Sequence, residues 1–208
     1  MRQNKGFSLI EMLAALLVTS AIIVPLLFSL TASVATNDIM IKRSVATSMT
    51  SAALQGFQTM YYTDIENKIN DIGNGHFLAF NRDNGCSILR NNRPFSPTSI
   101  QTAANNRALC DNIFEIQNIN TTFDGNQYQV FVYPFQVEAA NLTAYQNAID
   151  QAHANGIIPD ETLRDLMKNI PVGQSINILR VTVWIQYGDG SNQVVIRSGL
   201  LSPEMELD

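Results

Sequence analysis

An uncharged run near the amino terminus constrains this chain more than any other feature. The 26 residues from Met12 to Asn37 carry no charge and are mostly Leu, Ile, Val, Ala and Phe. At about 1.5 Å per residue, a helix of this length spans roughly 39 Å, enough to cross a hydrocarbon core of about 30 Å with some tilt. Pro25 lies within the run and is expected to kink or loosen the helix, because proline lacks the backbone N–H and its ring clashes with the preceding turn.

The residues before the run predict its orientation and set it apart from a secretory signal. Arg2 and Lys5 precede it, and the positive-inside rule keeps that end in the cytoplasm, with the remaining residues outside the membrane. A secretory signal has a shorter apolar core, of about 7–15 residues, followed by a small-residue cleavage site. Glu11 lies in the first helical turn of the apolar stretch. An acid is costly at this position and therefore indicates a functional role. A plain membrane anchor would not need an acid there.

The residues around Glu11 resemble a known processing signature. The segment Lys5-Gly6-Phe7-Ser8-Leu9-Ile10-Glu11 is similar to the start of type IV pilin and type II secretion pseudopilin precursors: a basic leader, a Gly–Phe cleavage site and a Glu four residues after the Phe. The resemblance, which covers about the first 35 residues, implies that a membrane-embedded prepilin peptidase cuts between Gly6 and Phe7 and that Phe7 becomes N-methylated. The alternative is an ordinary signal anchor that matches by chance.

The charges left after such a cleavage give Glu11 a role in assembly. Phe7 would carry a positive amine in an apolar phase, where Glu11 is the only nearby anion. Glu11 of an incoming subunit can neutralise the Phe7 amine of a subunit already in a filament. The low dielectric strengthens this pairing, and an unpaired charge is strongly penalised. The pair would therefore set the axial register between subunits.

Beyond the run, the sequence continues with helical character. We expect one long helix from about Ser8 to about Tyr62, its first half in lipid or filament core and its second half packed on a sheet. The alternative is two helices with a break near Thr36-Asn37. An apolar stripe at helical spacing is formed by Val45, Met49, Ala52, Ala53, Gly56 and Met60.

Residues 63–127 are rich in Asn, Gly and Pro and predict an irregular connection with short strands at His76–Phe80 and Phe114–Ile119. Cys86 and Cys110 lie in this region, 24 positions apart. In an extracytoplasmic compartment they can oxidise, and closing a loop of that size stabilises the fold by about 3 kcal/mol in the chain-entropy model. We expect a disulfide between them; the alternative is two free or buried thiols.

The last third of the chain predicts an antiparallel sheet interrupted by two short helices. Strands are expected at Gln127–Tyr133 and Ile176–Tyr187, the latter joined through Asp189-Gly190 to a closing strand at Gln193–Ile196 that ends in a small-polar tail, Arg197-Ser198-Gly199. Between the strands, helices are expected at Ala139–Ala154, which stops at Gly156, and after Pro159. This hairpin is similar to the carboxy-terminal hairpin of larger minor pilins. The predicted fold class is α+β, with a long helix packed on an antiparallel sheet, as in pilins.

Composition and motifs argue against other functions. The net charge of −5 disfavours nucleic acid as a bulk partner, and four loop arginines (Arg82, Arg90, Arg93 and Arg107) are the closest approach to a DNA-binding patch. No phosphate loop, His-Glu-x-x-His, Gly-x-Ser-x-Gly or Cys-x-x-Cys motif is present. Turn chemistry explains Asp124-Gly125 and Asp189-Gly190 better than calcium does, and His76 and His153 are isolated. We expect no enzyme activity, cofactor or metal.

These observations favour a structural assembly protein over a displayed binding module. The predicted organisation is a leader at residues 1–6, a membrane-spanning and filament-core helix at 7–36 and an extracytoplasmic domain at 37–208. The resemblance implies a prepilin peptidase, an inner-membrane assembly platform and other pilin or pseudopilin subunits as partners, with membrane lipid around the helix before assembly. A large globular part predicts a minor subunit, and Glu11 predicts a place below another subunit. The alternative is an adhesin or DNA-capture module, with the Asn-rich loop and residues 139–170 as its candidate surfaces.

Overall fold

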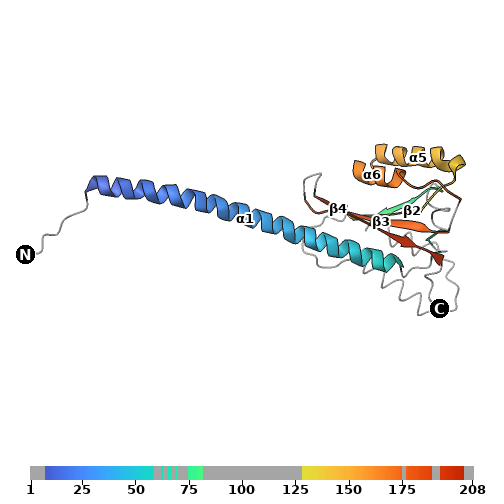
Figure 1. The fold of residues 1–208 in the computed structure, drawn as a ribbon, viewed down its shortest axis with the longest axis horizontal. Helices are drawn as coiled ribbons and strands as arrows, with labels where there is room; N and C mark the ends of the chain where they lie inside the picture. Colours follow the sequence, from blue (N-terminus) through green and yellow to red (C-terminus); the bar gives the residue numbers. More distant parts are fainter. Residues whose placement is uncertain are drawn as a thin grey trace, which may run out of the picture. The chain divides into compact units, whose positions relative to one another are not determined.

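The structure is a computed structural model of the chain, and it describes residues 8–58, 62, 65, 66, 69, 75–81, 128–174, 177–188 and 193–203. The chain divides into two compact units, Met1–Ile41 and Lys42–Asp208. The first contains only helix among its described residues, and the second contains a sheet with helices on it (Figure 1). The predicted strand at Phe114–Ile119 lies outside the described residues.

Helix α1 runs without interruption from Leu9 to Gln58. The prediction of one long helix is confirmed, and the alternative break near Thr36-Asn37 is wrong, since α1 continues through it and through Pro25. In the first unit the large apolar side chains of α1 are exposed, from 78% for Leu9 to 41% for Ile39. By length and composition alone, α1 is able to cross a membrane.

Hydroxyl groups in the apolar part of α1 bond to the helix itself. Thr19 Oγ1 donates to the carbonyl of Ala15 at 2.6 Å, and Thr36 Oγ1 donates to that of Ala32 at 2.9 Å. Ser20 and Thr31 make equivalent bonds to carbonyls one turn earlier. These four hydroxyls therefore need no partner from a neighbouring molecule, which makes them compatible with an apolar surrounding.

The described strands form one antiparallel sheet with the order β1-β2-β3-β4. Their bounds are Leu78–Asn81, Tyr128–Pro134, Leu179–Gln186 and Val194–Leu201. This arrangement confirms the predicted α+β class. The expected end of the last strand is wrong: Arg197, Ser198 and Gly199 lie within β4 instead of forming a tail, because β4 pairs with β3 through to Leu201 opposite Leu179.

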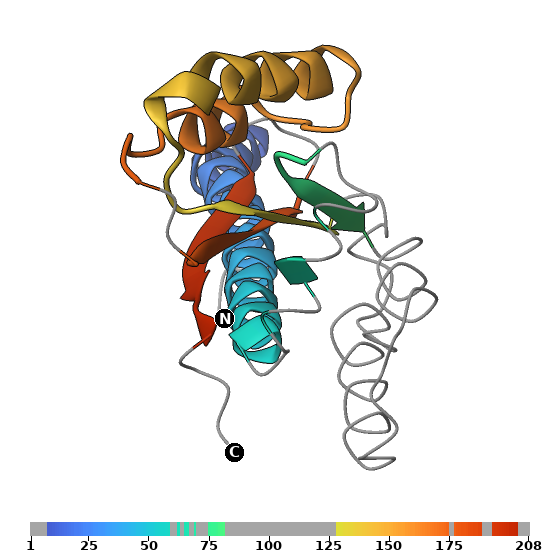
Figure 2. The ribbon, with the colours of Figure 1, turned by 90° about the vertical axis from the view of Figure 1, so that its right-hand side faces the viewer.

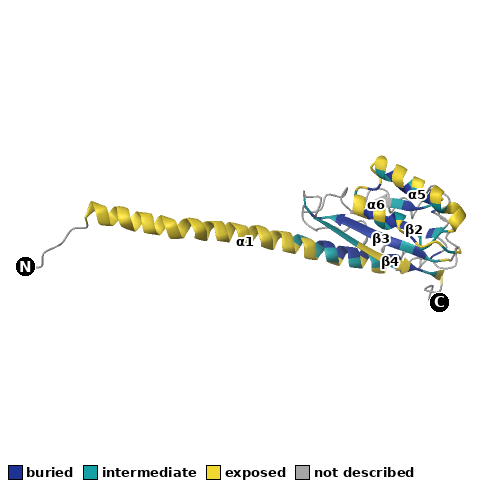
Figure 3. Cartoon of the chain, turned by 45° about the horizontal axis from the view of Figure 1, so that its top comes forward, coloured by how far each residue is buried: buried dark blue, intermediate teal, exposed yellow. Residues whose placement is uncertain are grey.

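The sheet of the second unit is covered on both faces (Figure 2). Alternate strand residues, such as Val130 and Val183, join a core with the part of α1 that belongs to this unit, including Phe57 at 0% exposure. The other set, including Phe131 and Trp184, packs under two helices. Figure 3 shows burial on α1 confined to its carboxy-terminal part. The domain therefore has three layers, with the sheet in the middle.

Most of the stripe predicted on α1 matches the buried face: Met49, Ala53 and Gly56 are buried and Val45 packs against the core. Ala52 was predicted wrongly, since it is exposed, and the side chain of Met60 lies outside the described residues. The buried face also includes three residues that were not predicted: Ala46, Thr50 and Phe57. Small residues on several sides of this helix make the stripe ambiguous in the sequence, and contact with the sheet decides which of them face the core.

The two short helices cover the sheet with their apolar sides. Helix α5 spans Ala139–Ala154 as predicted, and it stops before Gly156, whose φ of +73° suits glycine. Helix α6 spans Glu161–Lys168, and its first turn is capped by Asp160, whose Oδ1 accepts the Leu163 N–H at 3.1 Å. The buried residues of the two helices are Tyr145, Ile149, Ala152, Leu163 and Met167. Lys168 Nζ also donates to Asp150 at 2.7 Å, joining α6 to α5.

Two tyrosine hydroxyls are buried between the sheet and these helices. The hydroxyl of Tyr133 bonds to that of Thr182 at 3.0 Å, which bonds in turn to the Ser198 hydroxyl at 2.7 Å. The hydroxyl of Tyr145 donates to the carbonyl of Met167 at 2.8 Å. Burial is the main cause that raises the pKa of Tyr133 and of Tyr145 above the ordinary value of 10.0.

These pKa shifts predict loss of stability at alkaline pH. Because the folded state holds each proton more tightly than the unfolded state, the stabilisation is complete below pH 10 and falls as the pH rises above it. The expected slope is about 1.4 kcal/mol per pH unit for each tyrosine. Urea unfolding in detergent, followed by the fluorescence of Trp184, the single tryptophan of the chain, measures it. The double variant Tyr133→Phe/Tyr145→Phe should show a shallower slope above pH 10, and an unchanged slope would contradict the assignment.

Candidate functional site: the start of helix α1

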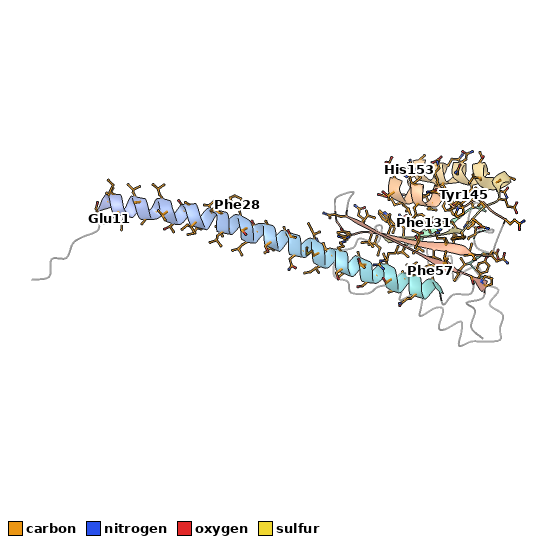
Figure 4. All side chains as sticks on the ribbon, viewed as in Figure 1. Glu11, Phe28, Phe57, Phe131, Tyr145 and His153 are labelled. Carbon is orange, nitrogen blue, oxygen red and sulfur yellow. The ribbon has the colours of Figure 1, made fainter. Side chains whose placement is uncertain are left out.

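The first turn of α1 is closed by two reciprocal hydrogen bonds between Ser8 and the turn that follows it. The backbone N–H of Ser8 donates to Glu11 Oε2 at 3.0 Å, and the N–H of Ile10 donates to Ser8 Oγ at 3.3 Å. This is a capping box of the Ser-x-x-Glu type, in which each side chain satisfies an N–H that lacks a partner at a helix start. Glu11, labelled in Figure 4, is therefore held at a defined place at the start of the helix.

The cap uses only part of the hydrogen-bonding capacity of Glu11. A carboxylate accepts several hydrogen bonds, and the Ser8 N–H is the one donor to the Glu11 side chain among the described residues. Glu11 also lies near the positive end of the helix dipole, which favours a negative charge. The remaining lone pairs can accept an ammonium group from another chain without breaking the cap.

The surroundings of Glu11 are apolar and open. Leu9, Ile10, Met12 and Leu13, its sequence neighbours on both sides, are each more than half exposed. A lipid or protein environment around these side chains would have a low dielectric constant, in which a carboxylate gains strongly from a cationic partner. The arrangement can thus hold a positive charge beside Glu11.

The other predicted site residues lie outside the described residues. Gly6 and Phe7 precede the first described residue, and Cys86 and Cys110 fall in the undescribed segment between Asn81 and Tyr128. The capping role of Ser8 was not predicted, although Ser8-x-x-Glu11 ahead of an apolar run is a recognised signal for a helix start.

The described parts of the two candidate binding surfaces show few groups that could bind a ligand. Residues 139–170 bury most of their large apolar side chains against the sheet, although Ile157 is 46% exposed. The exposed face of α5 carries mainly Asn, Gln, Thr and Ala. Within the described ranges, no three His, Cys, Asp or Glu side chains group as a metal site would require. The Asn-rich loop with its arginines lies outside the described residues.

Comparison with known proteins bears on the amino-terminal segment. Residues 1–27 match the prokaryotic N-terminal methylation motif, which is the signature of type IV pilin and pseudopilin precursors. The match confirms the resemblance found in the sequence, and it implies processing by a prepilin peptidase and assembly with other pilin subunits. Neither a curated protein nor a solved structure matches the chain.

Proposed function

We propose that this chain is a minor structural subunit of a type IV pilus or a type II secretion pseudopilus. A prepilin peptidase cuts after Gly6, Phe7 becomes N-methylated, and the subunit then assembles through α1. The observation that carries the proposal is a carboxylate, Glu11, fixed in the first turn of a long, exposed, apolar helix inside the methylation motif.

The membrane stage of this function follows from the charges and the length of the apolar run. Arg2 and Lys5 keep the amino terminus in the cytoplasm, residues 7–36 span the membrane, and residues 37–208 lie outside it. The partners at this stage are lipid, the peptidase and an inner-membrane assembly platform. In the filament, other pilin or pseudopilin subunits replace the lipid around α1.

The assignment as a minor subunit is supported by the size of the domain. The sheet of the second unit carries a layer of two helices, α5 and α6, in addition to α1, whereas a repeating subunit is usually compact. Glu11 supports a place below another subunit, since a subunit at the extreme tip has no neighbouring amine above it to neutralise.

Quantitative mass spectrometry of sheared filaments tests both parts of the proposal. We expect the chain in the filament fraction, with an N-methylated Phe7 as its first residue and at a small fraction of the most abundant subunit. Absence from purified filaments would contradict the structural role. Presence as the most abundant subunit would contradict the minor assignment and leave the structural role standing.

The cysteines provide a further prediction for the mature protein. If Cys86 and Cys110 are bridged outside the cytoplasm, thiol labelling without reductant should be negligible, and non-reducing electrophoresis should show a compact monomer that is retarded after reduction. Bridging is expected to stabilise the domain by about 3 kcal/mol. Stoichiometric labelling of both thiols in protein recovered from cells would show that no disulfide is present.

A further inference from the structure

Among the described strands, β4 forms an outer edge of the sheet. All eight of its residues pair with β3, from Val194 opposite Gln186 to Leu201 opposite Leu179. On its other side, no residue within the described ranges pairs with it. Figure 2 shows β4, in dark red, at one margin of the sheet. An open edge of this length exposes backbone N–H and C=O groups that can pair with another chain.

The usual protections of an edge strand are missing from β4. Its sequence, Val-Val-Ile-Arg-Ser-Gly-Leu-Leu, contains no proline and one charged residue. Its pairing with β3 proceeds residue by residue with no bulge. Proteins commonly protect edges with proline, bulges, several charges or a covering element. Within the described part of the chain, the outer edge of β4 is therefore able to pair with an added strand.

The two faces of β4 differ in chemistry. Arg197, opposite Val183, is exposed and makes no ion pair with a described residue. On the opposite face, Leu200 is 39% exposed and Ile196 is half-buried, with the exposed Ser198 between them. A strand added to this edge would fit best with acidic side chains on the face of Arg197 and apolar ones on the face of Leu200, because side chains alternate between faces along a strand.

We propose that β4 accepts residues 204–208 of a second copy of this chain as an added strand. These residues read Glu-Met-Glu-Leu-Asp, with acids at 204, 206 and 208 alternating with Met205 and Leu207. Their acidic side complements Arg197, and their apolar side complements Leu200 and Ile196. An extended segment of five residues measures roughly 17 Å, which fits along an edge of eight residues, roughly 26 Å long.

The connection between β4 and this segment favours a second copy over the same copy. Only Ser202 and Pro203 separate Leu201 from Glu204. A tight two-residue hairpin turn requires a positive φ that Gly or Asn supplies, whereas proline holds φ near −65° and serine disfavours the left-handed region. Ser202 and Pro203 therefore disfavour a tight turn after β4, which favours pairing between two copies.

A peptide-binding experiment on the full chain in detergent tests this interaction. A fluorescently labelled peptide of residues 202–208 should bind with saturable anisotropy, and binding should weaken about tenfold in Arg197→Gln. Arg164→Gln, which removes an arginine on α6 instead of β4, should bind as the unchanged chain does. Two altered peptides separate the contributions: Gln-Met-Gln-Leu-Asn keeps the strand pattern without the charges, and Glu-Pro-Glu-Pro-Asp keeps the charges but cannot pair as a strand.

The outcomes are distinct from those of the proposed function, since none depends on leader processing. We expect both altered peptides to bind at least tenfold more weakly. Equal binding of the proline peptide would show attraction by charge alone and overturn strand addition. If the peptide bound Arg197→Gln as tightly as the unchanged chain, the proposed contact of its acidic side chains with Arg197 would be overturned. Chemical cross-linking of the full chain should give dimers that are lost when residues 204–208 are deleted; unchanged dimers, or none in the intact chain, would overturn the second copy as the occupant.

Discussion

Replacing Gly6 by Val is expected to leave the chain as a full-length precursor that retains residues 1–6. In the proposed processing, Gly6 enters the peptidase active site, where a branched side chain would be expected to clash. The Ser8–Glu11 cap and the apolar residues of α1 are unchanged in this variant, so membrane insertion should proceed normally. Intact-mass spectrometry of the membrane fraction measures the result.

A matched control within the leader makes this experiment specific. Gln3→Ala changes the leader three residues before Gly6 and should be processed as the unchanged chain is. An amino terminus at Phe7 in the Gly6→Val variant would mean that cleavage does not depend on Gly6, and the processing site would then have to be reassigned.

The second large effect is expected at Glu11. Glu11→Ala should be processed and inserted normally, because removing an acid makes the helix more apolar, but it should be lost from filaments. The Phe7 amine of the neighbouring subunit would have no counter-charge, and breaking one half of a buried pair costs about 3–5 kcal/mol. Near equilibrium this cost reduces occupancy by about a hundred-fold to a few thousand-fold. Comparison of sheared-filament and membrane fractions measures the loss.

The capping box supplies the control that this substitution needs. Glu11→Ala also removes the acceptor for the Ser8 N–H, a change of about 1 kcal/mol. Glu11→Gln keeps an acceptor at that position but carries no charge, so it should be excluded nearly as strongly as Ala. Glu11→Asp should be intermediate, because its shorter side chain reaches less far toward the amine. Incorporation of the Gln variant at the unmutated level would show that the negative charge is not what assembly requires.

Local signals in the sequence predicted some elements closely and others poorly. The bounds of α5 followed from an apolar face ending at Gly156, and both determinants lie within the helix and its immediate neighbours. The end of β4 depended on a distant strand: Ser198 and Gly199 look like a loop locally, but β3 supplies their pairing, and Thr182 supplies a partner for the Ser198 hydroxyl. The buried face of α1 was likewise decided by contact with the sheet.

The candidate site shows the same division between local and distant causes. Glu11 could be identified because an acid at the edge of an apolar run is costly in any context, and Ser8 could have been identified from its spacing to Glu11 alone. The packing of α5 and α6 on the sheet was not visible in residues 139–170 themselves. Their burial depends on side chains outside that range, such as Phe131 in β2 and Trp184 in β3.

The hydroxyl groups of α1 that bond to its own backbone affect how such a helix can move from lipid into a bundle of helices. Thr19, Ser20, Thr31 and Thr36 already bond to their own backbone, so moving α1 from lipid to a bundle of helices breaks no hydrogen bond at these positions and requires no new one. The contacts of its apolar side chains with lipid tails are exchanged for similar contacts with neighbouring helices, at little net gain or loss. In the proposed assembly, extraction from the bilayer would then be nearly neutral along most of the helix, and the pairing of the Glu11 charge at its start would decide the direction of transfer.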